Sequence, residues 1–317
     1  MTERKTVLVV VGPTASGKTA LAVEACLAFG GEVVSADSMQ IYRGMDIGTA
    51  KPDLEERRGV SHHLMDIVDP DMPFSVADWQ QAARRTIDDL HARNRLAVVA
   101  GGTGLYVNSL VQNLSFSEVA GDPAYRERLH DMAREAGVEA VHALLARKDP
   151  ESAARIHPNN LVRVVRTLEV VEATGETMAV HHMRSKAAPS PWRFVILGLL
   201  PERHLLYERI NRRVDVMLGQ GLEAEVHRLL DAGYAPTLTS MQGIGYKELA
   251  AHFRGECPRE VAVEAIRQGS RNYAKRQITW FSRLEGLSWH DPQRLGMEGL
   301  LQLARQRLSS ADDVTNG

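Results

Sequence analysis

The 317 residues contain only two cysteines, Cys26 and Cys257, and neither stands at metal-ligand spacing from a second thiol. Such sparse cysteine usage is typical of a reducing compartment, so we expect the protein to be cytoplasmic. Nowhere do eighteen apolar residues stand together, so no membrane-spanning helix is predicted. The N-terminal residues lead directly into an apolar run that is too short for a secretory leader, and we expect none.

The chain also lacks a large excess of charge of either sign. It has 38 Lys plus Arg against 40 Asp plus Glu, which gives a formal net charge of -2. The field of the whole molecule therefore does not draw it to nucleic acid or to an anionic membrane. A polyanionic partner must instead be bound by a local basic patch.

Short β-branched runs alternate with helical patterns over the first hundred residues, which is typical of a parallel sheet with helices on both faces. A helix is predicted to begin at Ser75, which has the spacing of a capping box with Asp78, and to run to about Asn94. Further elements are predicted from periodicity: strands at 7–11, 32–35, 63–68, 96–100 and 194–200, and a helix at 19–29.

Between about residues 113 and 191 the strand pattern stops and helical signals replace it. Asp122 and Asp149 each stand directly before a proline, which predicts an N-cap followed by proline at the first helical position. We therefore predict an α/β fold in which a P-loop parallel sheet core carries an all-helical insertion domain. The predicted bounds are 1–112 and 192–308 for the core, 113–191 for the insertion and 309–317 for a flexible tail.

The most specific local motif is G-x-x-x-x-G-K-[ST], which stands between the first predicted strand and the first predicted helix. Backbone N–H groups of such a loop and the N-terminus of the following helix bind phosphate, so we expect a diphosphate here. Lys18 would bridge its oxygens and Thr19 would hold Mg²⁺. The diphosphate-binding set is Gly12, Pro13, Thr14, Ala15, Ser16, Gly17, Lys18 and Thr19.

The usual features of nucleotide hydrolysis are missing around this loop. The strand at 96–100 is followed by glycines and Thr103 instead of an acid that would order Mg²⁺, and neither D-x-x-G nor N-K-x-D is found. Asp37 follows the second strand, at the edge where open α/β sheets bind ligands. It is either a cap of its own turn or the acceptor of a proton from a nucleophile that attacks beside the diphosphate.

Five segments are more specific than these motifs: GPTASGKT at 12–19, DSMQIYRGMDIGTAKP at 37–52, HHLMD at 62–66, GGTGLY at 101–106 and YAKRQITWF at 273–281. Together they resemble the tRNA dimethylallyltransferase (tRNA isopentenyltransferase) family, over about residues 7–290. The resemblance implies transfer of dimethylallyl from dimethylallyl diphosphate to N6 of the adenosine 3′ of the anticodon in tRNA. The alternatives are a small-molecule kinase, a prenyltransferase of free adenylate, and a binding protein without turnover.

The same resemblance implies roles for individual residues. Asp37 would be the general base, and the catalytic set would include Lys18, Thr103 and Arg213. Arg209 and Arg212 remain alternatives to Arg213 as the diphosphate contact, and Thr103 could equally be a strand-end cap. The implied tRNA contacts are Asp37, Ser38, Met39, Gln40, Thr103, Tyr125, Leu161, Val162, Arg163, Val164, Val165, Gln242, Gly243 and Lys247.

A basic ridge is predicted on a helix near the C-terminal end. Residues 267–283 contain five basic side chains and no acid, and Arg267, Arg271 and Lys275 recur every four residues beside an apolar stripe. We expect Arg271, Lys275 and Arg276 to contact the phosphates of RNA, with a plain solvated helix face as the alternative. We expect a monomer.

Two histidine pairs, at 62–63 and 181–182, suggest a metal site at first sight. Adjacent side chains on a strand point to opposite faces, and no second pair of ligands stands at zinc spacing. No metal site is therefore predicted at either pair.

Overall fold

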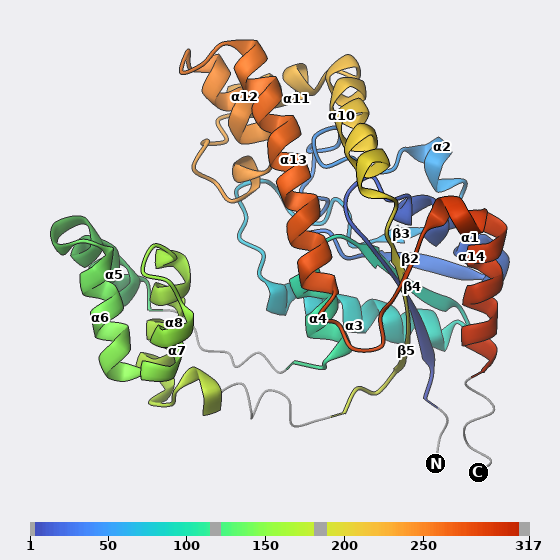
Figure 1. Cartoon of the computed structure of the whole chain (residues 1–317), viewed down its shortest axis with the longest axis horizontal. Helices are drawn as coiled ribbons and strands as arrows, with labels where there is room; N and C mark the ends of the chain where they lie inside the picture. Colours follow the sequence, from blue (N-terminus) through green and yellow to red (C-terminus); the bar gives the residue numbers. More distant parts are fainter. Residues whose placement is uncertain (1–3, 115–121, 181–188, 311–317) are drawn as a thin grey trace. The chain divides into compact units, whose positions relative to one another are not determined.

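A computed structural model of the chain describes residues 4–114, 122–180 and 189–310. Within them, six parallel strands form one sheet in the order β3-β2-β4-β1-β5-β6, which confirms the predicted α/β core (Figure 1). The strands are β1 (Thr6–Val11), β2 (Gly31–Ser35), β3 (His62–His63), β4 (Leu96–Gly101), β5 (Arg193–Leu199) and β6 (Ser288–His290).

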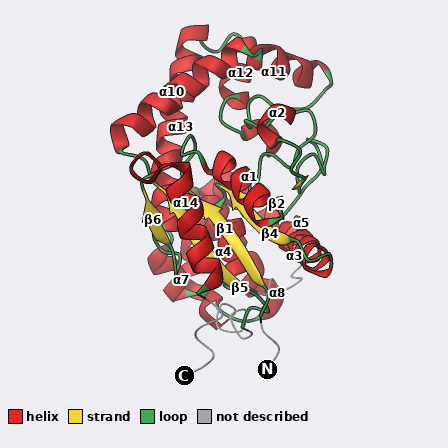
Figure 2. Cartoon of the chain, turned by 90° about the vertical axis from the view of Figure 1, so that its right-hand side faces the viewer, coloured by secondary structure: helices red, strands yellow, loops and turns green. Residues whose placement is uncertain are grey.

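Helices cover both faces of the sheet (Figure 2). Strand β1 is buried on both sides: Leu8 and Val10 belong to one core, whereas Val7, Val9 and Val11 belong to the other. A strand buried on both faces is apolar throughout, which is why the apolar run at 7–11 predicted a strand. The covering helices are α1 (Lys18–Phe29) and α14 (Pro292–Ser309) on the first face, and α3 (Val76–Ala92) and α4 (Gly104–Val111) on the second.

A further group of helices packs around a separate core above the sheet in the view of Figure 1. Ile41, Tyr42 and Met45, from the segment after β2, are buried in this core, so it joins that segment to the helices. The group consists of α10 (Arg203–Gly219), α11 (Leu222–Asp231), the 3-10 turn η1 (Ser240–Gln242), α12 (Tyr246–Phe253) and α13 (Arg259–Phe281). The short helix α2 (Leu54–Arg57) follows the same segment after β2.

The chain divides into two compact units, one made of Met1–Val111 with Ser190–Gly317 and the other of Gln112–Pro189. The second unit is helical in its described part and has its own apolar core. Asp122 and Asp149 cap two of its helices, each followed by proline, as the sequence predicted. Its helices are α5 (Pro123–Ala136), α6 (Val138–Lys148), α7 (Pro150–Arg155) and α8 (Leu161–Thr174).

Two strands differ from the predictions. The strand expected at 63–68 is limited to the two residues of β3, because Leu64 and Asp66 have positive φ values of 62° and 55°, which end the extended backbone. Only an isolated bridge between Tyr42 and Val68 continues it. Strand β6 was not predicted, since three residues are too few for a periodic pattern.

Three smaller features complete the fold. Of the expected tail, residues 311–317 lie outside the described residues, and Ser309 is the last residue of α14. The predicted capping box at the start of α3 is present: the Ser75 hydroxyl accepts from Asp78 N, and the Asp78 carboxylate accepts from Ser75 N. Across residues 4–114, 122–180 and 189–310, no helix has both the length and the apolar character needed to cross a membrane.

The buried ring of Trp79 gives a direct test of the packing between α3 and the sheet. Its ring stacks on Tyr106 at 4.6 Å, and its Nε1 donates to Ser35 O at 2.9 Å. Replacing Trp79 with Ala should lower the free energy of unfolding by about 3–5 kcal/mol, because it leaves a cavity. Urea denaturation followed by circular dichroism measures the change. The control Leu54→Ala, at a residue 85% exposed, should change it by less than about 0.5 kcal/mol.

Candidate active site

The phosphate loop turns between β1 and α1 as the sequence predicted, and Lys18 is the first residue of α1. Gly17 has a φ of 92°, which favours glycine, and a Cβ atom at Gly12 would lie 2.6 Å from the carbonyl oxygen of Leu199. No side chain of the described residues caps the N-terminus of α1. Its first N–H groups are therefore available to a phosphate.

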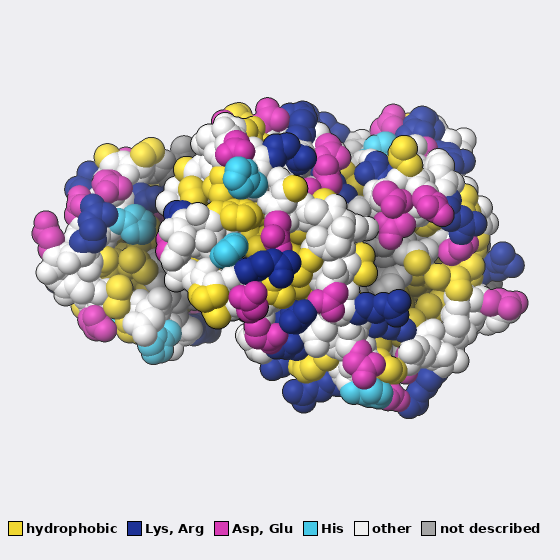
Figure 3. Space-filling model, turned by 90° about the horizontal axis from the view of Figure 1, so that it is seen from above, with side chains coloured by type: hydrophobic (Ala, Val, Ile, Leu, Met, Phe, Trp, Pro, Cys, Tyr) yellow, Lys and Arg dark blue, Asp and Glu magenta, His cyan; other side chains and the backbone are white. Residues whose placement is uncertain are grey.

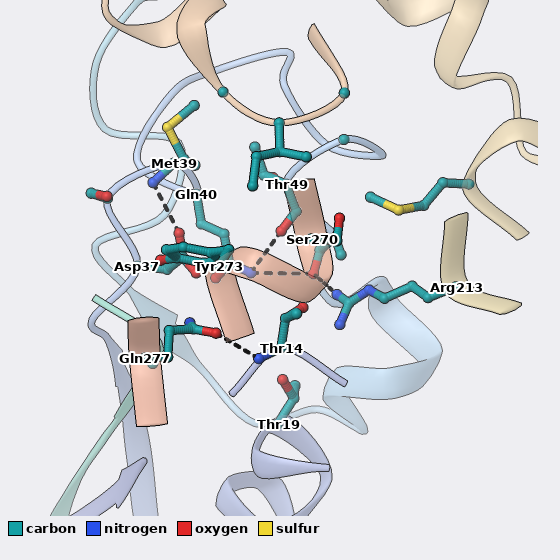
Figure 4. Close-up of a pocket in the computed structure, with 18 of the residues that line it drawn as sticks. Thr14, Thr19, Asp37, Met39, Gln40, Thr49, Arg213, Ser270, Tyr273 and Gln277 are labelled. Carbon is teal, nitrogen blue, oxygen red and sulfur yellow. Dashed lines mark hydrogen bonds between the residues drawn. The ribbon is translucent and has the colours of Figure 1, made fainter. Parts of the chain in front are cut away.

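A cavity of about 360 Å³ lies over this loop, between the strand ends and helices α10, α12 and α13. Figure 4 shows Asp37 and Tyr273 on one side of this space, Arg213 on the other, and Thr14 and Thr19 below. The described part of the chain contributes one acidic and four basic side chains to its wall: Asp37, Lys18, Arg213, Lys247 and Arg276. In a chain with a net charge of -2, this wall is locally suited to an anion.

Asp37 caps its turn and also lines the cavity, so its role as a cap leaves it accessible to a ligand. One carboxylate oxygen, Oδ1, accepts from Met39 N at 2.9 Å, and the other has no hydrogen bond within the described residues. The turn is held by Thr103, whose Oγ1 accepts from Ser38 N at 2.9 Å and donates to Ser38 Oγ at 3.2 Å. The Thr103 hydroxyl thus positions the turn that carries Asp37, and Thr103 does not line the cavity.

The pKa values of Lys18 and Arg213 are shifted by burial and by the neighbouring charges. Burial and, to a smaller extent, Arg213 lower the pKa of Lys18 to about 8, against the opposing influence of Asp37. Burial also lowers the pKa of Arg213, against the influence of Asp37 and Glu56. The lowered pKa values of Lys18 and Arg213 indicate that the cavity holds too little negative charge to balance the two cations. A bound anion would balance them.

The structure adds two site residues on α13 that the sequence argument did not single out. Gln277 is buried and bridges the phosphate loop to the end of β4: Thr14 N donates to its Oε1 at 2.8 Å, and its Nε2 donates to Gly102 O at 3.0 Å. The Tyr273 ring lines the cavity, and burial and Asp37 together raise its pKa. The sequence signal was a polar residue, Gln277, within the apolar stripe of this helix.

The three neighbouring arginines of α10 are separated by the structure. Arg213 lines the cavity, and its Nη2 donates to Ala50 O at 3.4 Å. Arg209 and Arg212 line a neighbouring cavity of about 860 Å³, which shares Lys18 and Arg213 with the first. Arg213 is therefore the arginine of this group that reaches both spaces.

Several of the predicted tRNA contacts surround the mouth of the same cavity. Its wall includes the residues that follow β2 and those that lead into α12. Gln40 is fixed within this wall, because its Oε1 accepts from Ser35 Oγ at 3.1 Å and its Nε2 donates to Ala50 O at 3.2 Å. The predicted contacts in the wall are Asp37, Ser38, Met39, Gln40, Gln242, Gly243, Lys247 and Arg276.

Not every predicted residue has an accessible side chain. In the phosphate loop, five residues line one of the two cavities: Thr14, Lys18 and Thr19 the first, and Ala15 and Gly17 the second. The other three, Gly12, Pro13 and Ser16, line neither.

In the helical unit the side chains of three predicted tRNA contacts are buried in the core of that unit, namely Tyr125, Val164 and Val165. Val162 is 77% exposed, Arg163 is exposed and Leu161 is partly buried.

The expected basic ridge on α13 is partly neutralised. Arg267 pairs with Asp215 at 2.5 Å, and Arg271 pairs with Glu264 at 2.8 Å. Both acids lie outside the range 267–283, which is why that range has no acid of its own. Figure 3 shows basic and acidic side chains side by side on the face seen from above. Lys275 is exposed and has no acidic partner within the described residues.

The first histidine pair makes separate contacts. His62 Nδ1 lies 2.9 Å from Val60 O, and His63 Nε2 lies 2.7 Å from Glu32 Oε2. The second pair, at 181–182, lies outside the described residues. Among the residues that are described, no group of three or more His, Cys, Asp and Glu side chains is arranged to hold a metal ion.

Comparison with known proteins identifies the family of the chain. The model of the family described as IPP transferase matches residues 40–284. A tRNA dimethylallyltransferase of Geobacter metallireducens is 50% identical over 288 residues, which are 90% of this chain and 93% of that protein. One from Acetivibrio thermocellus is 48% identical over 283 residues, covering 89% and 90%.

Two solved structures are similar over nearly the whole chain. The tRNA isopentenylpyrophosphate transferase of Bacillus halodurans has a TM-score of 0.74 and 41% identity, over 99% of this chain and 100% of that one. A eukaryotic dimethylallyltransferase acting on tRNA has a TM-score of 0.81 and 27% identity, over 95% and 77%. The family match and the identities over nine-tenths of the chain lead to one conclusion: this chain belongs to the IPP transferase family.

Proposed function

We propose that this chain is a tRNA dimethylallyltransferase. It transfers the dimethylallyl group from dimethylallyl diphosphate to N6 of the adenosine 3′ of the anticodon in tRNA, and it releases diphosphate. The observation that carries the proposal is that Lys18, Arg213 and Asp37 line a single cavity over the phosphate loop. The relatives named tRNA dimethylallyltransferase support it. We also propose that the protein works in the cytoplasm, as a monomer.

The reaction follows from the positions of these groups. The N–H groups of the loop and of α1 hold the diphosphate, while Lys18 and Arg213 stabilise the negative charge that grows on it as the allylic C–O bond breaks. The adenine amine attacks the freed carbon, and a new C–N bond forms. Asp37 accepts the proton that the amine loses, so the products are the prenylated base and diphosphate.

Mg²⁺ fits the oxygen chemistry of the loop. The Thr19 side chain lines the cavity, and its hydroxyl makes no hydrogen bond within the described residues. Mg²⁺ commonly binds through one or two protein oxygens together with waters and substrate phosphates, so we propose that Thr19 holds it. The ion would neutralise charge on the diphosphate oxygens.

The adenosine must leave its stack in the anticodon loop to reach Asp37. We propose that Ser38, Gln40 and Gln242, which line the cavity, hydrogen-bond the extruded nucleotide. The exposed Lys275 and the exposed start of α8 in the helical unit would contact the RNA backbone. The proposed insertion domain, residues 113–191, thus adds a second RNA-binding surface to the core.

The first prediction concerns Asp37. Incubation of the protein with dimethylallyl diphosphate and unmodified tRNA should give prenylated adenosine by mass analysis, and Asp37→Ala should lower the single-turnover rate by about 100-fold or more. The control Asp69→Ala removes an exposed carboxylate paired with Arg43 and should leave the rate unchanged. Phosphoryl transfer from ATP to a small acceptor, without prenylated RNA, would contradict the proposal.

The second prediction uses the pKa of Lys18. Because this pKa is about 8, the charged fraction of the lysine falls as the pH rises through that value. The affinity for inorganic diphosphate, measured by calorimetry between about pH 7 and pH 9, should therefore decline relative to that of Lys18→Met. The variant corrects for ionisation of the ligand itself. Parallel pH profiles of the two proteins would show that Lys18 does not bind the diphosphate.

The third prediction separates free from paired cations on α13. Lys275→Ala should weaken tRNA binding and reduce the slope of log K against log salt by about one. Arg267→Ala should have a smaller effect, because Arg267 already pairs with Asp215. Filter binding at several salt concentrations measures both slopes. Equal losses for the two variants would mean that the ion pair opens to bind RNA.

A further inference from the structure

A carboxylate buried in the helical layer holds part of the cavity wall in place. Glu225, on α11, is only 3% exposed. Its Oε2 accepts from the backbone N–H groups of Asp46 at 2.9 Å and Ile47 at 2.8 Å. Its Oε1 accepts from Gly48 N at 3.0 Å and from the Tyr246 hydroxyl at 2.6 Å. Four donors thus offset the cost of burying this charge.

Tyr246 fixes the same loop from another side. Its side chain is 1% exposed, and a Cβ atom at Gly48 would lie 2.4 Å from its ring. Only glycine therefore allows the loop to pass over this ring. Successive N–H groups that converge on one carboxylate form an anion-binding nest, and here the anion belongs to the chain itself. The loop is consequently held through its backbone by the Glu225 side chain of α11 and packs on the Tyr246 ring of α12.

The other side of this loop faces the cavity. Gly48, Thr49 and Ala50 line its wall, and Gln40 Nε2 donates to the carbonyl oxygens of Thr49 at 3.3 Å and Ala50 at 3.2 Å. The Arg213 guanidinium donates to Ala50 O as well. The position of the loop therefore helps to fix the Arg213 guanidinium and the Gln40 side-chain amide within the site.

We propose that Glu225 and Tyr246 are positioning residues of the reaction: they fix residues 46–50 and thereby the direction in which Arg213 faces the diphosphate. Glu225 does not line the cavity, whereas Tyr246 lines it with its hydroxyl hydrogen-bonded to Glu225, so both act on the reacting groups through the loop. The inference rests on the proposed function, because it assigns to Arg213 the stabilisation of the leaving group.

The test compares Glu225→Gln and Tyr246→Phe with wild type in the full-length protein. In Glu225→Gln an amide N–H₂ replaces one oxygen, so at least one backbone N–H of the loop faces another donor and loses its partner. We expect kcat to fall about 10- to 100-fold through misplacement of the cation, with the KM for tRNA within about twofold of wild type. Tyr246→Phe removes one donor of four and keeps the ring, so its loss of kcat should be smaller.

Hydrogen exchange supplies a readout that does not depend on activity. Amide exchange in the peptide containing residues 46–50 should accelerate in Glu225→Gln, with little change in the sheet. The matched control is Glu223→Gln on the same helix, whose carboxylate pairs with Arg259 at the surface. That variant should behave as wild type in both measurements.

The outcomes distinguish the two proposals. Faster loop exchange together with a lower kcat supports the positioning role. Faster loop exchange with an unchanged kcat overturns it, and so does unchanged exchange or exchange that accelerates throughout the sheet. If wild type transfers no prenyl group at all, the proposed function fails, and the positioning role, which rests on it, falls with it.

Discussion

The site depends on one electrostatic constraint: two cations, Lys18 and Arg213, are enclosed in a cavity that offers them a single carboxylate, Asp37, among its described lining residues. Removing like charges from water costs free energy, and the lowered pKa values of both cations express that cost. The proposed diphosphate would reverse it. Binding of such an anion would be favoured by the shortage of negative charge as well as by the N–H groups of the loop.

Close packing around the site explains why β4 ends in glycines instead of an acid. A Cβ atom at Gly101 would lie 2.2 Å from the carbonyl oxygen of Ala36, and one at Gly102 would lie 2.2 Å from Nε2 of Gln277. The space that a metal-binding acid would need is filled by the turn that carries Asp37 and by a side chain of α13. The acid of this site, Asp37, comes instead from the turn after β2, and it lines the cavity over the phosphate loop.

The features that the sequence predicted are those set by neighbouring residues. The phosphate loop, the capping box at Ser75 and the Asp-Pro caps of the helical unit each depend on a few adjacent side chains, so local chemistry was sufficient. Contacts between distant segments were not accessible in this way. The pairing of Arg267 with Asp215 joins two helices, and the contact of Glu225 with residues 46–48 joins segments almost 180 residues apart. No periodicity encodes such pairs, because they depend on how the helices pack.

Helix α13 contributes side chains both to the cavity and to the surface beside it, and Gln277 shows why. With 3.6 residues per turn, Tyr273 and Gln277 point to the cavity and the phosphate loop, while Lys275 between them is exposed. An apolar residue at position 277 would continue the buried stripe, but it would remove the hydrogen bonds that Gln277 makes with Thr14 N–H and Gly102 C=O. Loss of hydrogen-bond partners inside the protein destabilises the fold. A glutamine in an apolar stripe therefore follows from the need to join this helix to the phosphate loop.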